Sequence, residues 1–405
     1  MLPSPHIHDF RGKLRQHDTL GRVREYLRSN PARDQASIGS FSELFNRSAG
    51  QRMGPLSINL DLTTACNYQC PHCIDADIIN TAHHGSIESI RSTLVILRIA
   101  GLKSVILIGG GEPTRYPRLF EAIRTIKLLG MQCAVVSNGS GNTVLERSSS
   151  LLTRGDWIRL SLDAGTDATF QSLHKPAGRI TLEHICETAA LIKRANSVIQ
   201  LGFSFVVMTP DVQAMDPRLV PNVQEMSAAA KLAKAAEFDY ISFKPYLARD
   251  SDGKEVVPAV ASKNLIRDAL QEAYVHETSS FRVIPSVNLL SILDADIRPD
   301  ARNQPRRCHM QALRQVVTPV GIYACPAYRG NQKSQLSGPE GYASVRQFMS
   351  TNIATRAQVQ RFDASHECRN ITCLYNDANW WLEGMALSDD DPFSEPAAAD
   401  EPVFL

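Results

Sequence analysis

From residue 56 onward the sequence alternates short β-rich runs with longer amphipathic stretches, and no other feature limits the fold as strongly. Five helical stretches, such as SIESIRSTLVILRIAG and TLEHICETAALIKRA, separate the β-rich runs. This alternation predicts an α/β fold, a parallel sheet with helices outside, either open or curled into a partial (β/α)6 TIM-like barrel. The six runs are LSINLDLTT (56–64), SVILIGGG (104–111), QCAVVSNG (132–139), WIRLSLDA (157–164), IQLGFSFVVM (199–208) and FDYISFKPY (238–246).

The chemistry of such folds lies at the carboxyl ends of the strands. In this sequence those ends carry Cys66, residues 109–112, residues 137–138, residues 161–163 and Lys244. Cysteines, glycines and polar side chains therefore gather at the edge of the sheet where a site is expected.

The rest of the chain divides around this core. We expect a helical N-terminal preface at 1–54, in which RGKLRQHDTLGRVREYL and SFSELF have helical spacing and act as a packing arm. The strand–helix core spans 55–250, and 251–307 supplies a connecting helix (at about 260–277), a strand and a linker. Residues 308–385 form a small cysteine-rich α+β extension, and the acidic, Pro/Ala-rich end at 386–405 reads as a disordered tail.

Composition narrows the function classes. The formal net charge is +1 and the charges are mixed, so no nucleic-acid-binding stripe is evident. The N-terminus lacks the apolar segment of a signal peptide, and no apolar run reaches the ~20 residues that span a bilayer. We therefore expect a cytoplasmic protein without membrane contact. In that reducing compartment the nine cysteines are ligands, catalysts or buried apolar residues rather than disulfides.

Three cysteines stand together in CNYQCPHC, where Cys66, Cys70 and Cys73 have the spacing C-x3-C-x2-C. This is not a usual zinc-finger spacing, but one loop can wrap it around a compact polynuclear centre. A [4Fe–4S] cube held by three thiolates leaves one iron without a protein ligand. That iron can chelate a small molecule through an amine and a carboxylate.

The next strands end in GGGEPT (109–114), SNG (137–139) and SLDAG (161–165). Together with the cysteine motif, these four ordered motifs resemble the radical S-adenosylmethionine (radical SAM) superfamily over about residues 55–250. The resemblance implies reductive cleavage of S-adenosylmethionine (SAM) to methionine and a 5′-deoxyadenosyl radical. That radical abstracts hydrogen from an unactivated C–H bond, and the electron comes from a one-electron reductant such as flavodoxin or ferredoxin.

The resemblance also implies site roles. The three cysteines hold the cluster, and its open iron binds the amino and carboxylate groups of SAM. The loop formed by Gly109, Gly110, Gly111 and Glu112 holds the SAM amino group. Ser161 and Asp163 are candidates for the ribose, with Asn138 nearby. His72 takes the position beside the adenine that is usually aromatic, a departure that keeps a flat ring but adds a titratable nitrogen.

Some charged residues have no single interpretation. In the family, the SAM carboxylate usually meets a cation beyond the fourth strand. Either Lys175 or Arg179 in HKPAGR fits this role. The alternative is that both are solvated charges at a helix end. Lys244 in FKPY either faces the substrate, which makes it the one catalytic candidate, or reaches solvent. Asp75 follows the cysteine loop and caps a turn.

A second set of cysteines, Cys308, Cys325, Cys368 and Cys373, lies beyond the core. It resembles the auxiliary-cluster extension called a twitch domain, a smaller relative of the SPASM domain, and implies a second [4Fe–4S] cluster. The interval from Gly321 to Cys325 is one residue shorter than usual, and HECRNITC is an uncommon ending in which His366 offers an alternative ligand. The alternatives are a structural zinc or unliganded buried cysteines.

The remaining cysteines and tryptophans have simpler interpretations. Cys133 and Cys186 read as small buried residues, with a hydrogen-atom donor for an epimerase as the minor alternative. Trp380 and Trp381 are expected to pin a final helix onto the body.

The leading functional prediction is oxidation or remodelling of a small molecule. A fully thiolate-ligated second cluster has no open iron and suits an electron acceptor. A radical SAM peptide maturase is the second interpretation. It is weakened because the preface is shorter than a peptide-binding winged-helix module of roughly 80 residues. An epimerase is the third, and a non-catalytic iron–sulfur or zinc protein comes from a different class. Such a protein has no need of the GGGEP loop.

Overall fold

The computed structural model describes residues 9–28, 54–247, 255–293, 302–388 and 402–405. They form one ten-stranded sheet with the strand order β10-β9-β8-β1-β2-β3-β4-β5-β6-β7. The strands are β1 (Ser57–Leu60), β2 (Ser104–Leu107), β3 (Gln132–Ser137), β4 (Trp157–Ser161), β5 (Gln200–Val207), β6 (Tyr240–Pro245), β7 (Arg282–Pro285), β8 (Arg314–Thr318), β9 (Gly321–Tyr323) and β10 (Gln335–Ser337).

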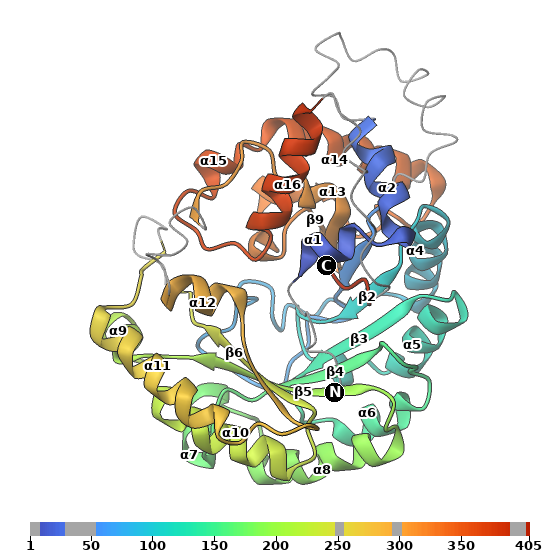
Figure 1. The fold of residues 1–405 in the computed structure, drawn as a ribbon. Coiled ribbons are helices and arrows are strands. Elements are labelled where there is room, and N and C mark those ends of the chain that lie inside the picture. Colours follow the sequence, from blue (N-terminus) through green and yellow to red (C-terminus); the bar gives the residue numbers. More distant parts are fainter. Residues whose placement is uncertain (1–8, 29–53, 248–254, 294–301, 389–401) are drawn as a thin grey trace.

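Helices connect these strands and flank them (Figure 1). The α-helices are α1 (Phe10–Leu14), α2 (His17–Arg28), α4 (Ile87–Ile99), α5 (Leu119–Leu128), α6 (Asn142–Ser149), α7 (Asp167–His174), α8 (Leu182–Ala195), α9 (Pro210–Met215), α10 (Met226–Ala235), α11 (Val260–Tyr274), α12 (Val287–Leu293), α13 (Met310–Leu313), α14 (Val345–Arg361), α15 (Ala364–Glu367) and α16 (Asn376–Leu387). Short 3-10 helices are η1 (Pro113–Arg115), η2 (Val223–Glu225), η4 (Pro326–Tyr328) and η5 (Gln332–Ser334).

The predicted α/β class and its six strand–helix units are confirmed. All neighbouring pairs from β1 to β7 are parallel, and β8 adds a further parallel strand beside β1. Only β9 and β10 run antiparallel, as a meander from β8. The sheet order is open rather than closed, so the partial-barrel alternative describes it better than a complete barrel.

Each strand sends alternate side chains to opposite faces, which gives the sheet an outer and an inner face. Outer-face residues such as Ile58, Val135 and Leu160 pack with helix residues such as Ile123 and Leu145 in the main hydrophobic core. Residues of the other parity define the inner face. Many of them are polar, and Ile106, Ala134 and Val136 belong to a small separate cluster. The helices α5, α6, α8 and α10 therefore lie on one side of the sheet, as the rim in Figure 1 shows.

The N-terminal helices pack against the C-terminal extension. Phe10, Leu14 and Val23 share a second buried core with residues of α13, α14 and α16, including Leu313 and Leu382. Figure 1 shows α2 beside α13, α14 and α16, above the strands. The helical part of the expected preface thus behaves as a packing arm, whereas SFSELF lies outside the described residues.

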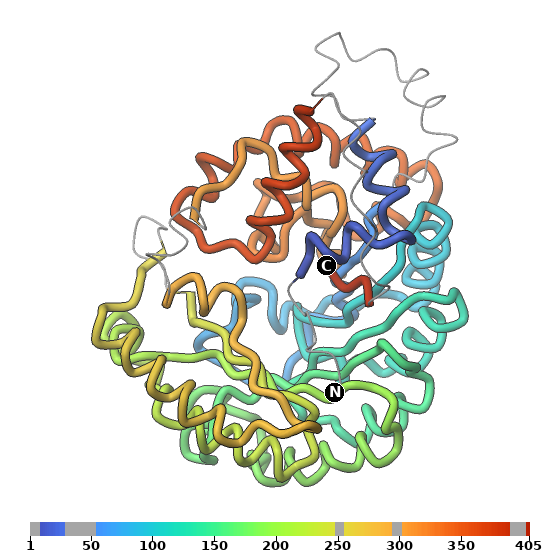
Figure 2. Tube along the Cα trace, in the orientation of Figure 1, coloured from blue at the N-terminus to red at the C-terminus, as the bar shows by residue number. Residues whose placement is uncertain are grey.

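The last residues of the chain differ from the predicted disordered tail. Phe404 is 5% exposed and packs on the inner face with Ile106, Ala134 and Val136. The Lys13 Nζ donates to the Phe404 carbonyl at 2.7 Å. Figure 2 shows this red C-terminal end beside the blue first helix. The physical reason is apolar burial, because the final Val-Phe-Leu follows the acidic stretch that suggested disorder.

Candidate functional site

Cys66, Cys70 and Cys73 lie on the loop that follows β1, at the carboxyl edge of the sheet, and none of them is in a disulfide. Burial raises the pKa of all three thiols, that of Cys73 to about 11. Cys66 and Cys73 each raise the pKa of Cys70 further, so the three sulfurs are electrostatic neighbours. Partly buried thiols that would repel one another as thiolates are suited to a metal, which displaces their protons.

Backbone contacts shape this cysteine loop. The Cys66 amide donates to Asn80 Oδ1 at 2.8 Å, and the Tyr68 amide lies 3.4 Å from the Cys66 sulfur. The Asn138 Nδ2 donates to Asn67 Oδ1 at 3.1 Å and lies 3.9 Å from the same sulfur. The SNG motif at the end of β3 is therefore in contact with the cysteine motif after β1.

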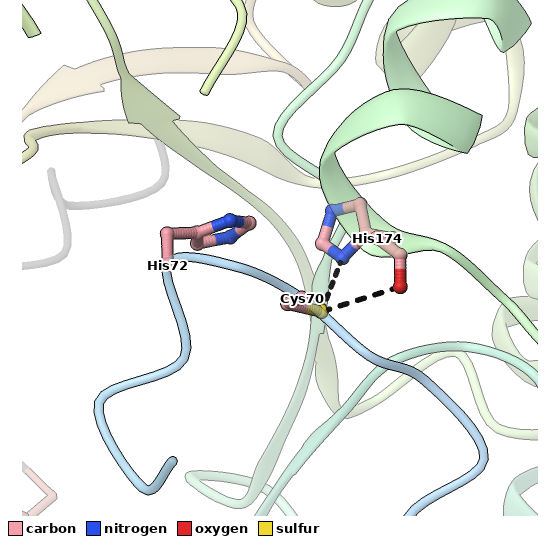
Figure 3. A group of neighbouring side chains, drawn as sticks. All are labelled: Cys70, His72 and His174. Carbon is pink, nitrogen blue, oxygen red and sulfur yellow. Dashed lines mark hydrogen bonds between the residues drawn. The ribbon is translucent and has the colours of Figure 1, made fainter. Parts of the chain in front are cut away.

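A histidine that the sequence analysis overlooked lies against the second cysteine. His174, in the last turn of α7, places Nδ1 3.3 Å from the Cys70 sulfur, which also lies 3.6 Å from the His174 carbonyl (Figure 3). Its Nε2 lies 2.9 Å from the Leu162 carbonyl. Burial lowers the pKa of His174 to about 4, against the opposing effect of Asp163. The sequence signal was a histidine four residues after Phe170 on an otherwise apolar helix face.

His72 and Asp163 form the next layer. The His72 Nε2 lies 3.1 Å from Asp163 Oδ2, and the other carboxylate oxygen accepts the Val206 amide at 2.7 Å. Burial raises the pKa of Asp163, but His72 and His174 lower it by more, so the net shift is downward. Asp163 has a φ of 49°, a left-handed conformation that turns its side chain toward the histidines. The two residues predicted to flank adenine and ribose are thus in contact.

Cys70, His72 and His174 form the one group among the described residues whose ligand atoms all lie within 4.8 Å of one another. The Nε2 atom of His72 is already hydrogen-bonded to Asp163, and that of His174 to the Leu162 carbonyl. We therefore interpret the histidines as surroundings of the cysteine site rather than as a separate metal centre.

The Glu112 carboxylate is buried and held by protein donors. Its Oε1 accepts the Thr114 amide and hydroxyl and the Ser137 hydroxyl, and its Oε2 accepts the Asn138 amide at 2.7 Å. Burial raises its pKa, and these hydrogen bonds oppose the rise. The carboxylate therefore ties the loop after β2 to the end of β3.

The glycines of the same loop let neighbouring segments of the protein approach its backbone closely. A Cβ on Gly111 would lie 2.3 Å from the Ala65 carbonyl oxygen, and one on Gly109 would meet the Arg329 guanidinium. Gly109 also has a φ of 77°. The Glu112 amide donates to the Ala65 carbonyl at 2.9 Å. The glycine loop and the cysteine loop are therefore in direct backbone contact.

Arg329 joins the C-terminal extension to the core at this point. Its Nε lies 3.0 Å from Asp61 Oδ2, and its Nη1 lies 2.5 Å from Asp75 Oδ1. The Asp75 Oδ2 also accepts the Gly110 amide at 3.1 Å, so this residue does more than cap a turn. Burial acts to lower the pKa of Arg329, but the two aspartates raise it above its ordinary value.

The other predicted residues have different settings. Ser161 lies on the inner face, in register with Ser204, and Lys244 donates to that Ser204 hydroxyl at 3.1 Å. Lys175 and Arg179 are both exposed. Their loop follows α7 and pairs with the cysteine loop through the bridge between Tyr68 and Pro176.

The second set of cysteines also comes together. Burial raises the pKa of Cys308 well above its ordinary value, and Cys373, Cys325 and Cys368 each raise it further. The pKa of Cys373 is raised in the same way, to about 12. Cys325 lies two residues after β9, the second strand of the β8–β9 hairpin. His366 is exposed and is not among the groups that shift these two thiols.

The spacing of these four sulfurs bears on the metal. A tetrahedral zinc with thiolates at ~2.3 Å brings its sulfurs to within about 3.8 Å of one another. Across the described ranges, the four do not form a group with all ligand atoms within 4.8 Å.

Cys133 and Cys186 are buried in the main core between sheet and helices, away from the inner face. Trp380 donates to the Asn303 carbonyl at 2.9 Å, and Trp381 packs against the second core, so both help to fix α16. Within the described part of the chain, no helix has the length and apolarity needed to cross a membrane.

Comparison with known proteins adds a family match. Residues 60–217 match the family described as the Radical SAM superfamily. A protein named S-adenosylmethionine-dependent nucleotide dehydratase from Thermoplasmatales archaeon (strain ISO4-H5) is 31% identical over 152 residues. The match covers 37% of this chain and 52% of that relative, so the chain spans about half the length of the relative.

Two solved structures share the fold. Streptococcus suis SuiB bound to S-adenosylmethionine has a TM-score of 0.55 at 13% identity, over 76% of this chain and 68% of that one. The structure of anSMEcpe with bound AdoMet has a TM-score of 0.51 at 17% identity, over 76% of this chain and 82% of that one. At these identities the likeness concerns the fold alone.

Proposed function

The chain belongs to the radical SAM superfamily through residues 60–217, and from this premise we propose that it oxidises or remodels a small molecule. The reaction begins with reductive cleavage of SAM, and the 5′-deoxyadenosyl radical takes a hydrogen atom from an unactivated C–H bond. When bound at Cys66, Cys70 and Cys73, a [4Fe–4S] cluster supplies the electron for that cleavage. The clustered, protonated thiols at the carboxyl edge of the sheet are the donor set that it needs.

The chain's own residues then orient SAM. Carbonyl groups of the loop at 109–112 bind the ammonium, because Glu112 is taken up by Thr114, Ser137 and Asn138. Asp163 and His72 lie on the adenosine side, and Lys175 or Arg179 binds the carboxylate from the adjoining loop. A flavodoxin or ferredoxin is the proposed external reductant.

The single observation that favours an oxidation is the convergence of four thiols in the C-terminal extension. Cys308, Cys325, Cys368 and Cys373 would hold a second [4Fe–4S] cluster, and this cluster would supply an acceptor for the electron that the substrate radical loses once a base has removed its proton. Arg329 follows Cys325 closely in sequence and contacts Asp61 and Asp75 beside the first site, so the two cysteine sites share a structural bridge.

Iron content and SAM cleavage test this proposal. Anaerobic reconstitution should give about eight irons per chain, and about four when Cys66, Cys70 and Cys73 are all changed to Ala. Changing Cys325 and Cys368 to Ala should also leave about four irons. With a strong chemical reductant, that double variant should still form 5′-deoxyadenosine from SAM.

Two results would contradict parts of the proposal. Zinc at the second site, found by elemental analysis, would remove the electron acceptor and with it the preference for oxidation. Equal loss of 5′-deoxyadenosine and of finished product in the double variant, together with a large drop in melting temperature, would give the second site a structural role only.

A further inference from the structure

Two cations, Arg159 on β4 and Lys244 on β6, lie on the inner face without a carboxylate partner among the described residues. The Lys244 Nζ donates only to the Ser204 hydroxyl, at 3.1 Å. The Arg159 side chain is hydrogen-bonded to Tyr240, but its buried Nε has no hydrogen-bond partner. The buried hydroxyl of Ser242 is unpartnered as well.

The strand register places these groups on one surface. Arg159 is in register with Gly202, and Gly202 with Tyr240. One level nearer the carboxyl edge, Ser204 is in register with Ser242. In-register residues of parallel strands share a face, and Lys244 follows Ser242 by two residues, so it joins the same face.

Glycine at position 202 is what lets Tyr240 reach the arginine. A Cβ on Gly202 would lie 2.2 Å from the Tyr240 ring, so the ring occupies the space that a side chain would fill. The Tyr240 hydroxyl then holds Arg159, whose Cζ also lies 5.1 Å from the centroid of the Trp157 ring. The guanidinium is thus fixed in place by neutral groups, and its charge is not balanced by them.

The electrostatics of this pair are unfavourable without a ligand. Burial lowers the pKa of Lys244 well below its ordinary value, and Arg159 lowers it further. Asp163 raises the pKa of Lys244, but the oxygens of Asp163 already contact His72 and the Val206 amide. Two partly buried like charges without a counter-charge destabilise the fold, and an anion between them would relieve that cost.

The surroundings fix where such an anion would lie. Toward the amino ends of the strands, Trp157 and Phe404 close the inner face in ring contact, with centroids 5.3 Å apart. Toward the carboxyl ends, Asp163 and His72 mark the adenosine side of the candidate SAM site. We propose that the substrate carries an anionic group, a phosphate or a carboxylate, that Arg159 and Lys244 bind, with the hydroxyls of Ser242 and Tyr240 beside it.

This inference rests on the proposed function for the reaction, but its test does not require turnover. The reconstituted full-length protein with SAM is titrated by calorimetry with inorganic phosphate and, separately, with succinate. At least one of the two should bind, and the tighter one identifies the acid type. Lys244→Gln and Arg159→Gln should each weaken binding at least tenfold. Lys231→Gln, an exposed charge on α10, is the matched control and should bind as the parent does.

Charge-keeping variants separate loss of charge from loss of fold. Lys244→Arg and Arg159→Lys should retain binding to within about threefold of the parent, because a cation remains at each position. Melting temperatures are recorded for all variants.

A measurement that needs no substitution is acetylation of lysines followed by peptide mass spectrometry. Saturating phosphate or succinate, whichever binds, should slow acetylation of Lys244 at least fivefold and leave Lys231 unchanged.

Two results would overturn the inference. The first is that neither anion binds the parent protein. The second is that the parent and both Gln variants bind the anion with equal affinity and that the anion does not slow acetylation of Lys244. Neither result touches the proposed function, because SAM cleavage to 5′-deoxyadenosine is scored separately. Conversely, failure of SAM cleavage with anion binding intact would reject the proposed function and keep the anion site.

Discussion

Glu112 is the residue whose role the structure changes most. The sequence suggested a carboxylate free for an ammonium, but four hydrogen bonds from Thr114, Ser137 and Asn138 occupy it. Glu112→Ala should lower the free energy of unfolding by about 3 kcal/mol, because buried donors lose a charged acceptor. SAM affinity should fall at least tenfold as the glycine loop shifts, with iron content unchanged. Urea unfolding and equilibrium SAM binding measure the two effects.

The matched control is Glu121→Ala, since Glu121 is an exposed carboxylate paired with Arg118. It should change stability by no more than about 1 kcal/mol. Unchanged SAM affinity in Glu112→Ala would show that this loop does not position SAM.

The sequence predicted the motif residues better than their partners. Cys66, Glu112 and Asp163 could be placed because each follows a β-rich run at the carboxyl edge. His174 could not, since its approach to Cys70 is a tertiary contact between the end of α7 and the loop after β1, about a hundred residues apart in sequence. No local pattern encodes such a contact.

At the scale of elements, the turn after η4 fastens the extension to the core through Arg329 and its two aspartates, Asp61 and Asp75. Arg329→Met should lower the free energy of unfolding by about 4 kcal/mol, because it leaves buried carboxylates without their counter-charge. Adding Asp61→Asn to that variant should recover part of the loss. Both values come from urea unfolding of the cluster-free protein.

Arg218→Met serves as the control, because Arg218 forms an exposed ion pair with Asp216. We expect a change within about 1 kcal/mol there. Equal effects of Arg329→Met and Arg218→Met would mean that the buried bridge contributes nothing to stability.

The strands were predictable because β-rich runs and glycine-ended motifs alternate with amphipathic helices. What no pattern showed was that β8, at Arg314–Thr318, pairs with β1. Sequence separation hides such pairing, because a parallel strand shows only its own apolar run and not its neighbour. The expected division between a core and an extension therefore runs through one continuous sheet.

At the scale of the whole molecule, the C-terminal residues link the second core to the inner face. Leu405 packs in the second core, and Phe404 packs under the strands. Phe404→Ala should destabilise the protein by about 3 kcal/mol through lost burial and an unfilled space. Leu387→Ala, at a side chain that is 69% exposed, is the control and should be near neutral. Differential scanning calorimetry compares the two variants. Equal melting temperatures would show that packing of Phe404 on the inner face does not stabilise the protein.

The pairing of β1 with β8 also governs how the chain can be dissected. The Leu56 amide donates to the Leu313 carbonyl at 2.8 Å, and the Asp61 amide to the Val317 carbonyl at 2.9 Å. A fragment without residues 302–405 would leave β1 as a bare edge strand, a template for aggregation between copies. The two cysteine sites therefore cannot be separated by truncation. Each site must instead be removed by substituting its cysteines in the whole 405-residue chain. A version of the protein without the extension would need another element to cover the edge of β1.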